Sequence, residues 1–189
     1  DDLKAKQLLR QRKTDDLLAF VEDTVGQDAG GETSVIRTLV MTGQIPEALV
    51  RSKALYEKEP ENPVAQFLYA STLTYVQNDA EALPIFEALV EQEPGLIAAW
   101  TSIYGIHSRA QEEDKALAAL KTAEEANPDN LNLKWLRAGY LEQAGRPDEA
   151  IEIYETAYAM NSNQPVIANN LASLLSTTRD DAESLERAH

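Results

Sequence analysis

The sequence predicts an all-α fold, a solenoid in which antiparallel pairs of helices stack on one another. One observation is a ladder of prolines spaced 34 residues apart, at Pro60, Pro94 and Pro128. Another is a ladder of small residues with the same spacing, at Ala48, Ala82, Ala116 and Ala150. Between these markers apolar residues recur every three or four positions, which is typical of amphipathic helices. A repeat of this length accommodates two helices and their turns.

Each marker has a structural reason. Proline cannot continue a helix and restricts the residue before it, so the proline ladder marks the end of each unit. A small residue lets the second helix of a unit approach the first closely. Gly43 and Gly145 stand where the C-terminal turn of a helix is expected, and Pro63 and Pro147 stand where a helix is expected to begin. One helix pair cannot bury its apolar residues alone, so neighbouring units must stack.

The markers divide the chain into consecutive parts. Residues 1–28 are expected to form one or two amphipathic helices, as an N-terminal cap or a degenerate repeat, and the glycine-containing stretch 27–32 is expected to be a linker. Repeats are then expected at 29–62, 63–96, 97–130 and 131–164, followed by a truncated repeat at 165–189. The sequence starts without Met and stops a few residues into a helical pattern that begins near Asp180. We therefore expect it to be a fragment of a longer protein.

The segment 138–157 resembles a tetratricopeptide repeat. It carries the small and aromatic positions of that family in order, at Ala138, Gly145, Ala150, Tyr154 and Ala157. The resemblance covers residues 29–189, and the sequence departs from the family pattern at Ile36, Tyr104, His107 and Ser162. The resemblance implies a right-handed superhelix in which the first helix of each pair lines a concave face. It also implies that the chain binds proteins or peptides.

The charge and the missing residue types disfavour several classes of function. A formal net charge of −15 opposes binding to nucleic acid and to anionic membrane surfaces. There are no cysteines, no long apolar run and no common catalytic motif, so we expect no enzyme activity, cofactor, metal site or membrane insertion. His107 is expected to be a packed, hydrogen-bonded side chain, and the acidic runs 112–114 and 124–125 a solvated surface. We expect a soluble protein of the cytoplasm or the periplasm.

A binding surface is expected on the first helices of the pairs, at positions that point away from the second helices. The predicted partner-binding residues are Phe67, Ser71, Thr101, Trp135, Asn169 and Asn170, and Arg37 lies in the same register as Ser71. Aromatic anchors beside small residues suit a pocket for a partner's side chain. The alternative is that Phe67 and Trp135 pack between adjacent first helices of neighbouring pairs. The carboxylate clamp of some family members is not expected, because Thr33 and Phe67 occupy two of its positions and Asn170 alone matches.

Three functions remain open at this point. The first is a non-catalytic scaffold that binds a peptide or partner protein in the concave groove. The second is a regulatory or substrate-docking part of a larger enzyme, since arrays of these repeats are found fused to transferases. The third is a self-assembling structural protein or an envelope assembly or export factor. It is motivated by the truncated repeat, which would expose Leu171, Leu174 and Leu175, and by a likeness of 145–150 and 168–172 to bacterial repeat proteins of that kind.

Overall fold

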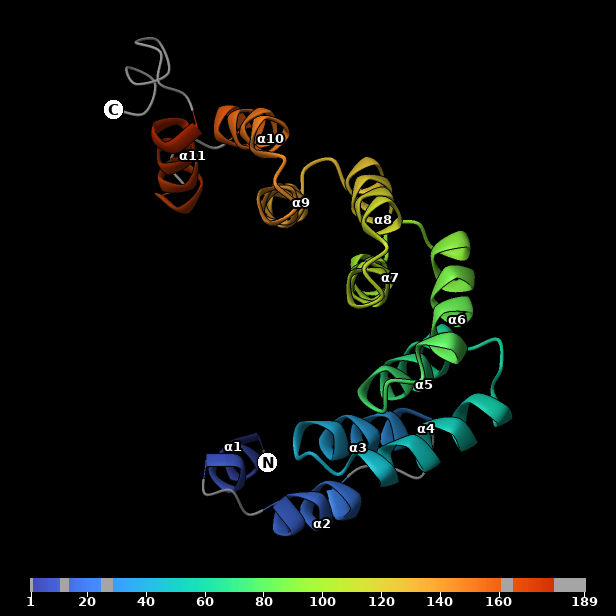
Figure 1. Cartoon of the computed structure of the whole chain (residues 1–189). Helices are drawn as coiled ribbons and strands as arrows, with labels where there is room; N and C mark the ends of the chain where they lie inside the picture. Colours follow the sequence, from blue (N-terminus) through green and yellow to red (C-terminus); the bar gives the residue numbers. More distant parts are fainter. Residues whose placement is uncertain (1, 11–13, 25–28, 161–164, 179–189) are drawn as a thin grey trace. The chain divides into compact units, whose positions relative to one another are not determined.

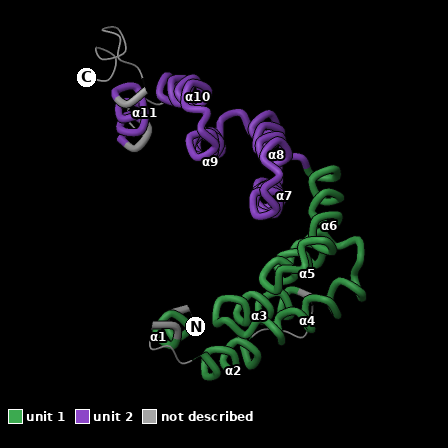
Figure 2. The backbone as a smooth tube through the Cα atoms, in the orientation of Figure 1, with its two compact units in different colours: residues 1–93 green, residues 94–189 purple. Residues whose placement is uncertain are grey.

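The computed structural model describes residues 2–10, 14–24, 29–160 and 165–178, and these residues form α-helices joined by short connections (Figure 1). The helices are α1 (Asp2–Arg10), α2 (Thr14–Thr24), α3 (Ala29–Met41), α4 (Ile45–Lys58), α5 (Pro63–Tyr75), α6 (Asp79–Gln92), α7 (Ile97–Arg109), α8 (Glu113–Ala126), α9 (Leu131–Gln143), α10 (Pro147–Met160) and α11 (Pro165–Thr178). They fall into two compact units, residues 1–93 and 94–189 (Figure 2). The predicted all-α fold of stacked helix pairs is confirmed.

In the first unit each of the helices α1 to α6 packs on the next, and α3 also contacts α5. The core therefore joins three helices at once. Ile36 of α3 is fully buried against Leu55 of α4 and against Ala65 and Leu68 of α5. Ile36 occupies a position where a small residue was expected. Its larger side chain is accommodated because it reaches across to α5 and fills the space between neighbouring helix pairs.

In the second unit α7 pairs with α8, α9 pairs with α10, and α11 packs on α10. One cluster of buried residues consists of Ala138, Leu141, Ala150, Ile153, Tyr154 and Ala157. Leu171 and Leu174 of α11 pack against this cluster, and Leu175 is fully buried. The expectation that these three leucines form an exposed face is therefore wrong. The apolar side of α11 is used within the unit, where it covers α10.

The small-residue ladder is fully buried in both units. Ala48, Ala82, Ala116 and Ala150 each have no exposed surface. Each lies in the first turns of the second helix of its pair, where that helix meets the first. The space between the two helices is closed at this point, and a longer side chain would force them apart. The close approach that the sequence predicted is confirmed.

The helix starts and ends follow the expected chemistry. Pro63 and Pro147 are the first residues of α5 and α10, and the Asn62 side chain caps α5 by accepting a 2.9 Å hydrogen bond from the Val64 N–H group. Gly43 and Gly145 end α3 and α9 with φ angles of 79° and 72°. Two glutamines adopt the same left-handed conformation at the equivalent turns, Gln77 with φ 58° and Gln111 with φ 59°. The turn geometry is thus kept in four pairs, although glycine is present in only two.

The predicted linker at 27–32 is wrong from residue 29 onward. Helix α3 begins at Ala29 and includes both glycines of that stretch, while residues 27 and 28 lie outside the described part of the chain. Two glycines weaken a helix by roughly 2 kcal/mol relative to alanine. Tertiary packing overcomes this preference, because Val35 and Leu39 of the same helix are buried against Ala48. Ser162, where the sequence departs from the family pattern, and the helical pattern expected from about Asp180 also lie outside the described residues.

Candidate partner-binding surfaces

A groove lies between α3 and α5 in the first unit. It has a volume of about 400 Å³, and its lining residues are Arg37, Val40 and Met41 of α3 and Phe67, Leu68, Ser71, Thr72 and Tyr75 of α5. The groove exists because α3 and α5 are neighbouring first helices that contact each other directly. Phe67 and Ser71, two of the predicted partner-binding residues, are brought together here. We call this surface the α3–α5 groove.

The rim of the α3–α5 groove is apolar and open to solvent. Met41 is 66% exposed and Tyr75 is 60% exposed. Neither residue was predicted to take part, although a simple signal marks them. Met41 follows Arg37 by four residues and Tyr75 follows Ser71 by four, so both lie one helical turn beyond the predicted positions, on the same helix face. Extending the predicted surface by that turn would have identified both residues.

The floor of the groove is held by contacts with the second helices. The Phe67 ring is half-buried and meets the fully buried Phe86 ring of α6 edge-on, with 5.7 Å between the ring centres. Thr72 is fully buried, and its hydroxyl lies 2.7 Å from that of Ser52 on α4. The Phe67 ring thus packs against the second helix of its own pair, a contact that the sequence did not predict, and it also lines the α3–α5 groove.

Arg37 gives the groove a positive charge. Its side chain is exposed, and no carboxylate among the described residues forms an ion pair with it. Most other arginines of the described chain are paired, as Arg51 is with Glu22 at 2.8 Å and Arg146 is with Glu149 at 2.6 Å. In a chain with a net charge of −15, an unpaired guanidinium beside apolar side chains is available to a carboxylate on a partner.

The remaining predicted residues lie in the second unit, on three different helices. Trp135 of α9 is 45% exposed, so it is an accessible aromatic side chain. The Thr101 hydroxyl of α7 donates to the Ala98 carbonyl at 3.0 Å and is thereby used within its own helix. Asn169 of α11 is exposed, whereas the Asn170 side-chain amide donates to the Tyr154 hydroxyl at 3.4 Å. No hydrogen bond or ring contact among the described residues joins Thr101, Trp135 and Asn169 to one another.

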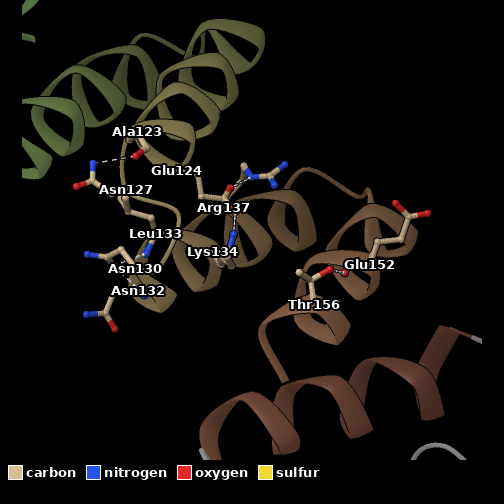
Figure 3. A network of polar contacts seen from close by, with 10 residues as sticks. All are labelled: Ala123, Glu124, Asn127, Asn130, Asn132, Leu133, Lys134, Arg137, Glu152 and Thr156. Atoms are coloured by element: carbon tan, nitrogen blue, oxygen red, sulfur yellow. Dashed lines mark hydrogen bonds and ion pairs between the residues drawn. The ribbon is translucent and has the colours of Figure 1, made fainter. Parts of the chain in front are cut away.

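A buried carboxylate links α8 to α9 in the second unit. Glu124 accepts a 2.9 Å hydrogen bond from Lys134 and a second one from Arg137, which lies one turn further along α9 (Figure 3). Burial alone would raise the pKa of Glu124, but the hydrogen bonds from Arg137 and Lys134 hold it below its usual range. The prediction of a solvated surface at 124–125 is therefore wrong for Glu124, since only Glu125 is exposed.

His107 has the structural role that the sequence predicted. The side chain is buried in α7, and its Nδ1 atom lies 2.6 Å from a carboxylate oxygen of Glu112. Hydrogen bonds from Lys115 and His107 together lower the pKa of Glu112. Within the described residues no cluster of three or more metal-binding side chains occurs. None of the helices in the described ranges has the length and apolarity needed to cross a bilayer.

Comparison with known proteins agrees with this helix-pair architecture. Residues 107–165 match the tetratricopeptide repeat family model. No match was found among curated proteins. The solved structures that resemble the chain are distant in sequence, so their likeness bears on the fold.

Three of these structures illustrate the likeness. MamA from Desulfovibrio magneticus is 16% identical with a TM-score of 0.65, over 86% of this chain and 92% of that one. A tetratricopeptide repeat protein from Parabacteroides merdae is 15% identical with a TM-score of 0.67, over 97% of this chain and 74% of that one. TTC0263, a tetratricopeptide repeat protein from Thermus thermophilus, is 24% identical with a TM-score of 0.55, over 84% and 85%. Residues 107–165 thus match the tetratricopeptide repeat family, and the chain shares the fold of these solved repeat proteins.

Proposed function

We propose that this chain is a non-catalytic scaffold that binds a peptide segment or partner protein, and that the α3–α5 groove is one place where it does so. The observation that carries this proposal is the composition of the groove. It combines exposed apolar side chains at Met41 and Tyr75, a half-buried aromatic floor at Phe67 and an unpaired cation at Arg37. A rigid apolar surface beside one charged group is typical of an anchor site for a protein partner.

The partner's chemistry follows from the same residues. An apolar side chain of the partner would displace water from Phe67 and Met41, and a carboxylate nearby would pair with Arg37. Serine at position 71 is small, so it leaves room for the backbone of the bound segment. Trp135 and Asn169 are exposed side chains of the other unit, and the use of Trp135 by a partner is tested separately. The wider concave groove remains a prediction of the sequence.

The test compares partner capture by variants that change only exposed residues. Met41→Asp and Tyr75→Asp place carboxylates in the groove, and because both side chains are mostly exposed, folding is expected to persist. Val50→Asp is the matched control, because Val50 is 69% exposed in the same unit and does not line the groove. Proteins bound from an extract of the source organism are quantified by mass spectrometry, and the leading partner is then purified and its Kd measured.

A partner retained by the wild type and by Val50→Asp, but lost by both groove variants, supports the proposal. The Kd of the purified partner should rise at least about tenfold in the groove variants, as expected when an interface anchor is disrupted. Equal binding by all four proteins would contradict the use of this groove. A Trp135→Ala variant carried in parallel shows whether the second unit binds the partner instead.

A further inference from the structure

A second surface of the first unit carries a separate set of groups. It is a crevice of about 560 Å³ between α4, α5 and α6, with no lining residue in common with the α3–α5 groove. Its lining residues are Tyr56 of α4, Gln66 and Tyr69 of α5, and Ala80, Glu81, Pro84, Ile85 and Ala88 of α6. We call it the α4–α6 crevice. It combines two tyrosines, a carboxylate, an amide and a short apolar wall.

The Glu81 carboxylate is held in place at this crevice by two uncharged donors. The Tyr69 hydroxyl donates to one carboxylate oxygen at 2.5 Å, and the Asn78 side-chain amide donates to the other at 2.8 Å. These bonds fix the orientation of the carboxylate, and each oxygen keeps further capacity to accept. No lysine or arginine among the described residues forms an ion pair with Glu81. The charge is therefore positioned but not neutralised.

The repeat provides an internal comparison for Glu81. The residues at the equivalent position of the other three pairs are Glu47, Lys115 and Glu149. Each of them has an oppositely charged partner in the chain. Glu47 pairs with Arg51 at 3.6 Å, Lys115 with Glu112 at 2.8 Å, and Glu149 with Arg146 at 2.6 Å. Among these four described positions, Glu81 is the one that lacks such a partner.

The pair of Arg146 and Glu149 shows how a cation engages a carboxylate at this position. Two nitrogens of the Arg146 guanidinium donate to the two carboxylate oxygens, at 2.6 and 2.8 Å. Asn78 occupies the position equivalent to Arg146, two repeats earlier, and supplies one of these hydrogen bonds without a charge. The arginine that satisfies Glu149 within the chain has thus no counterpart beside Glu81.

Gln66 adds an unsatisfied acceptor to the lining of the crevice. Its side chain is 8% exposed, and its Nε2 group donates to the Pro60 carbonyl at 2.7 Å. Its Oε1 atom is buried and accepts no hydrogen bond from the described residues. A buried acceptor without a donor is unfavourable, so such atoms are rare unless a ligand or water completes them. The amide that lines the crevice therefore has unused capacity to accept a hydrogen bond.

The rings and apolar groups narrow the choice of ligand further. Tyr56 and Tyr69 stack with 5.2 Å between their centres. A tyrosine face attracts a guanidinium or ammonium group. Pro84, Ile85 and Ala88 line the same crevice and suit the methylene stem of a long basic side chain. Arginine fits better than lysine, because its planar fork supplies five donors in a fixed arrangement that suits a carboxylate.

We propose that the α4–α6 crevice binds an arginine side chain of a partner protein, with the guanidinium paired to Glu81 in the crevice that the Gln66 amide also lines. The stem of the arginine lies along the apolar wall formed by α6. The bound arginine gives Glu81 an oppositely charged partner, which Glu47, Lys115 and Glu149 each have within the chain. It is independent of the α3–α5 groove, so either surface can function when the other does not.

The test uses the short peptide acetyl-Gly-Arg-Gly-amide as the probe and follows it by two-dimensional NMR of the labelled chain. The control peptide carries citrulline, which has nearly the same shape as arginine and no charge. The arginine peptide is expected to shift the side-chain amide signals of Gln66 and the ring signals of Tyr69 in a saturable manner, and the citrulline peptide to shift them much less. Binding should weaken as salt is added.

Two variants separate this site from the general acidity of the chain. Glu81→Gln should weaken binding at least about fivefold, as expected for removal of one member of a charge pair. Glu87→Gln removes the same charge from an exposed position of α6 outside the crevice and should leave binding unchanged. Circular dichroism confirms that both variants fold. Shifts spread over the whole acidic surface, equal binding by the two variants, or unchanged Gln66 signals at saturating peptide would each overturn the proposal.

Discussion

The hydroxyl groups of Ser52 on α4 and Thr72 on α5 lie 2.7 Å apart, and neither side chain is exposed to solvent. Each hydroxyl also lies near a backbone carbonyl of its own helix, Thr72 at 2.8 Å from that of Tyr69 and Ser52 at 3.1 Å from that of Leu49. Either hydroxyl can therefore donate to the other while its partner donates to its carbonyl. The pair joins the second helix of one repeat to the first helix of the next.

This pair should contribute measurably to stability. Ser52→Ala removes one hydroxyl of the pair, and we expect a loss of about 1–2 kcal/mol in the free energy of unfolding. Thr72→Val removes the other hydroxyl while keeping the shape, with a similar expected loss. In the double variant the loss should be smaller than the sum by roughly 0.5–1.5 kcal/mol, because neither hydroxyl is then left without its partner. Urea denaturation of the four proteins measures this, and strict additivity would show that the contact contributes nothing.

Glu124 predicts a dependence of stability on pH. The pKa of this carboxyl is lowered in the folded chain, so its contribution is present above the unfolded pKa of about 4.3 and is lost as pH falls through the lower, folded value. At neutral pH Glu124→Gln should reduce the free energy of unfolding by roughly 1–3 kcal/mol, since Lys134 and Arg137 lose their shared partner. The difference from the wild type should shrink steadily below about pH 4.

Glu125→Gln is the matched control for this measurement. It makes the same change at the next residue, whose side chain is 66% exposed. We expect a change within about 0.5 kcal/mol and no dependence on acid pH. If both variants behaved alike between neutral and acid pH, the contacts of Glu124 with α9 would have no energetic importance.

The sequence predicts the architecture well because the repeat is marked by residues with a special backbone conformation or a small side chain. Pro63 fixes its own φ angle, Gly145 permits a positive φ angle and Ala82 leaves room for a neighbouring helix, so at the repeat spacing they mark a helix start, a turn and a close approach. Gln77 and Gln111 show the limit of this reasoning. Their turns are forced by the helices on either side, and the residue type gives no sign of the left-handed conformation.

The candidate surfaces are predicted less completely, because they depend on contacts between residues far apart in the sequence. Helical periodicity predicts the groove residues Phe67 and Ser71, and it also predicts Met41 and Tyr75 when the same helix face is extended by one more turn. The buried position of Glu124 and the unpaired Glu81 do not follow from it. Both are ordinary acidic residues in amphipathic helices, and their state is set by whether Lys134, Arg137 or Asn78 stands opposite in a neighbouring element.

The left-handed glutamines predict a simple way to stabilise the chain. Gln77→Gly and Gln111→Gly should each raise the free energy of unfolding by about 0.5–1 kcal/mol, because glycine adopts this conformation without strain. The reverse change, Gly43→Ala, should lower it by about 1 kcal/mol. No atom lies within 4 Å of a Cβ built on Gly43, so any loss reflects the backbone alone.

Gln92→Gly serves as the control for these glycine variants. Gln92 is the last residue of α6 and has no left-handed backbone, so glycine there should destabilise the chain by up to about 1 kcal/mol. Thermal or urea unfolding of the four variants and the wild type measures these changes. A loss of stability in Gln77→Gly as large as in Gln92→Gly would show that the turn after α5 stores no strain.

The hydrogen bond between Tyr69 and Glu81 predicts an unusual tyrosine titration. Burial raises the pKa of the Tyr69 hydroxyl, and the hydrogen bond to the Glu81 carboxylate raises it further, to about 12. A raised folded pKa means that the folded chain holds this proton more tightly than the unfolded chain does. Its contribution is therefore complete below an unfolded pKa of about 10 and is lost as pH rises towards 12.

Ultraviolet absorbance of the phenolate measures this titration directly. In the wild type, Tyr69 should remain protonated well above pH 10, and so should Tyr154, whose pKa is also raised by burial, so the test is the change in this late part of the titration between the wild type and Glu81→Gln. Glu81→Gln removes the negative charge, so the pKa of Tyr69 should fall but stay above 10, because the burial remains. Glu87→Gln should leave the titration unchanged. A titration of Glu81→Gln identical to that of the wild type would mean that the Tyr69 hydroxyl does not donate to Glu81, and the carboxylate would then lack one of the two bonds that orient it in the α4–α6 crevice.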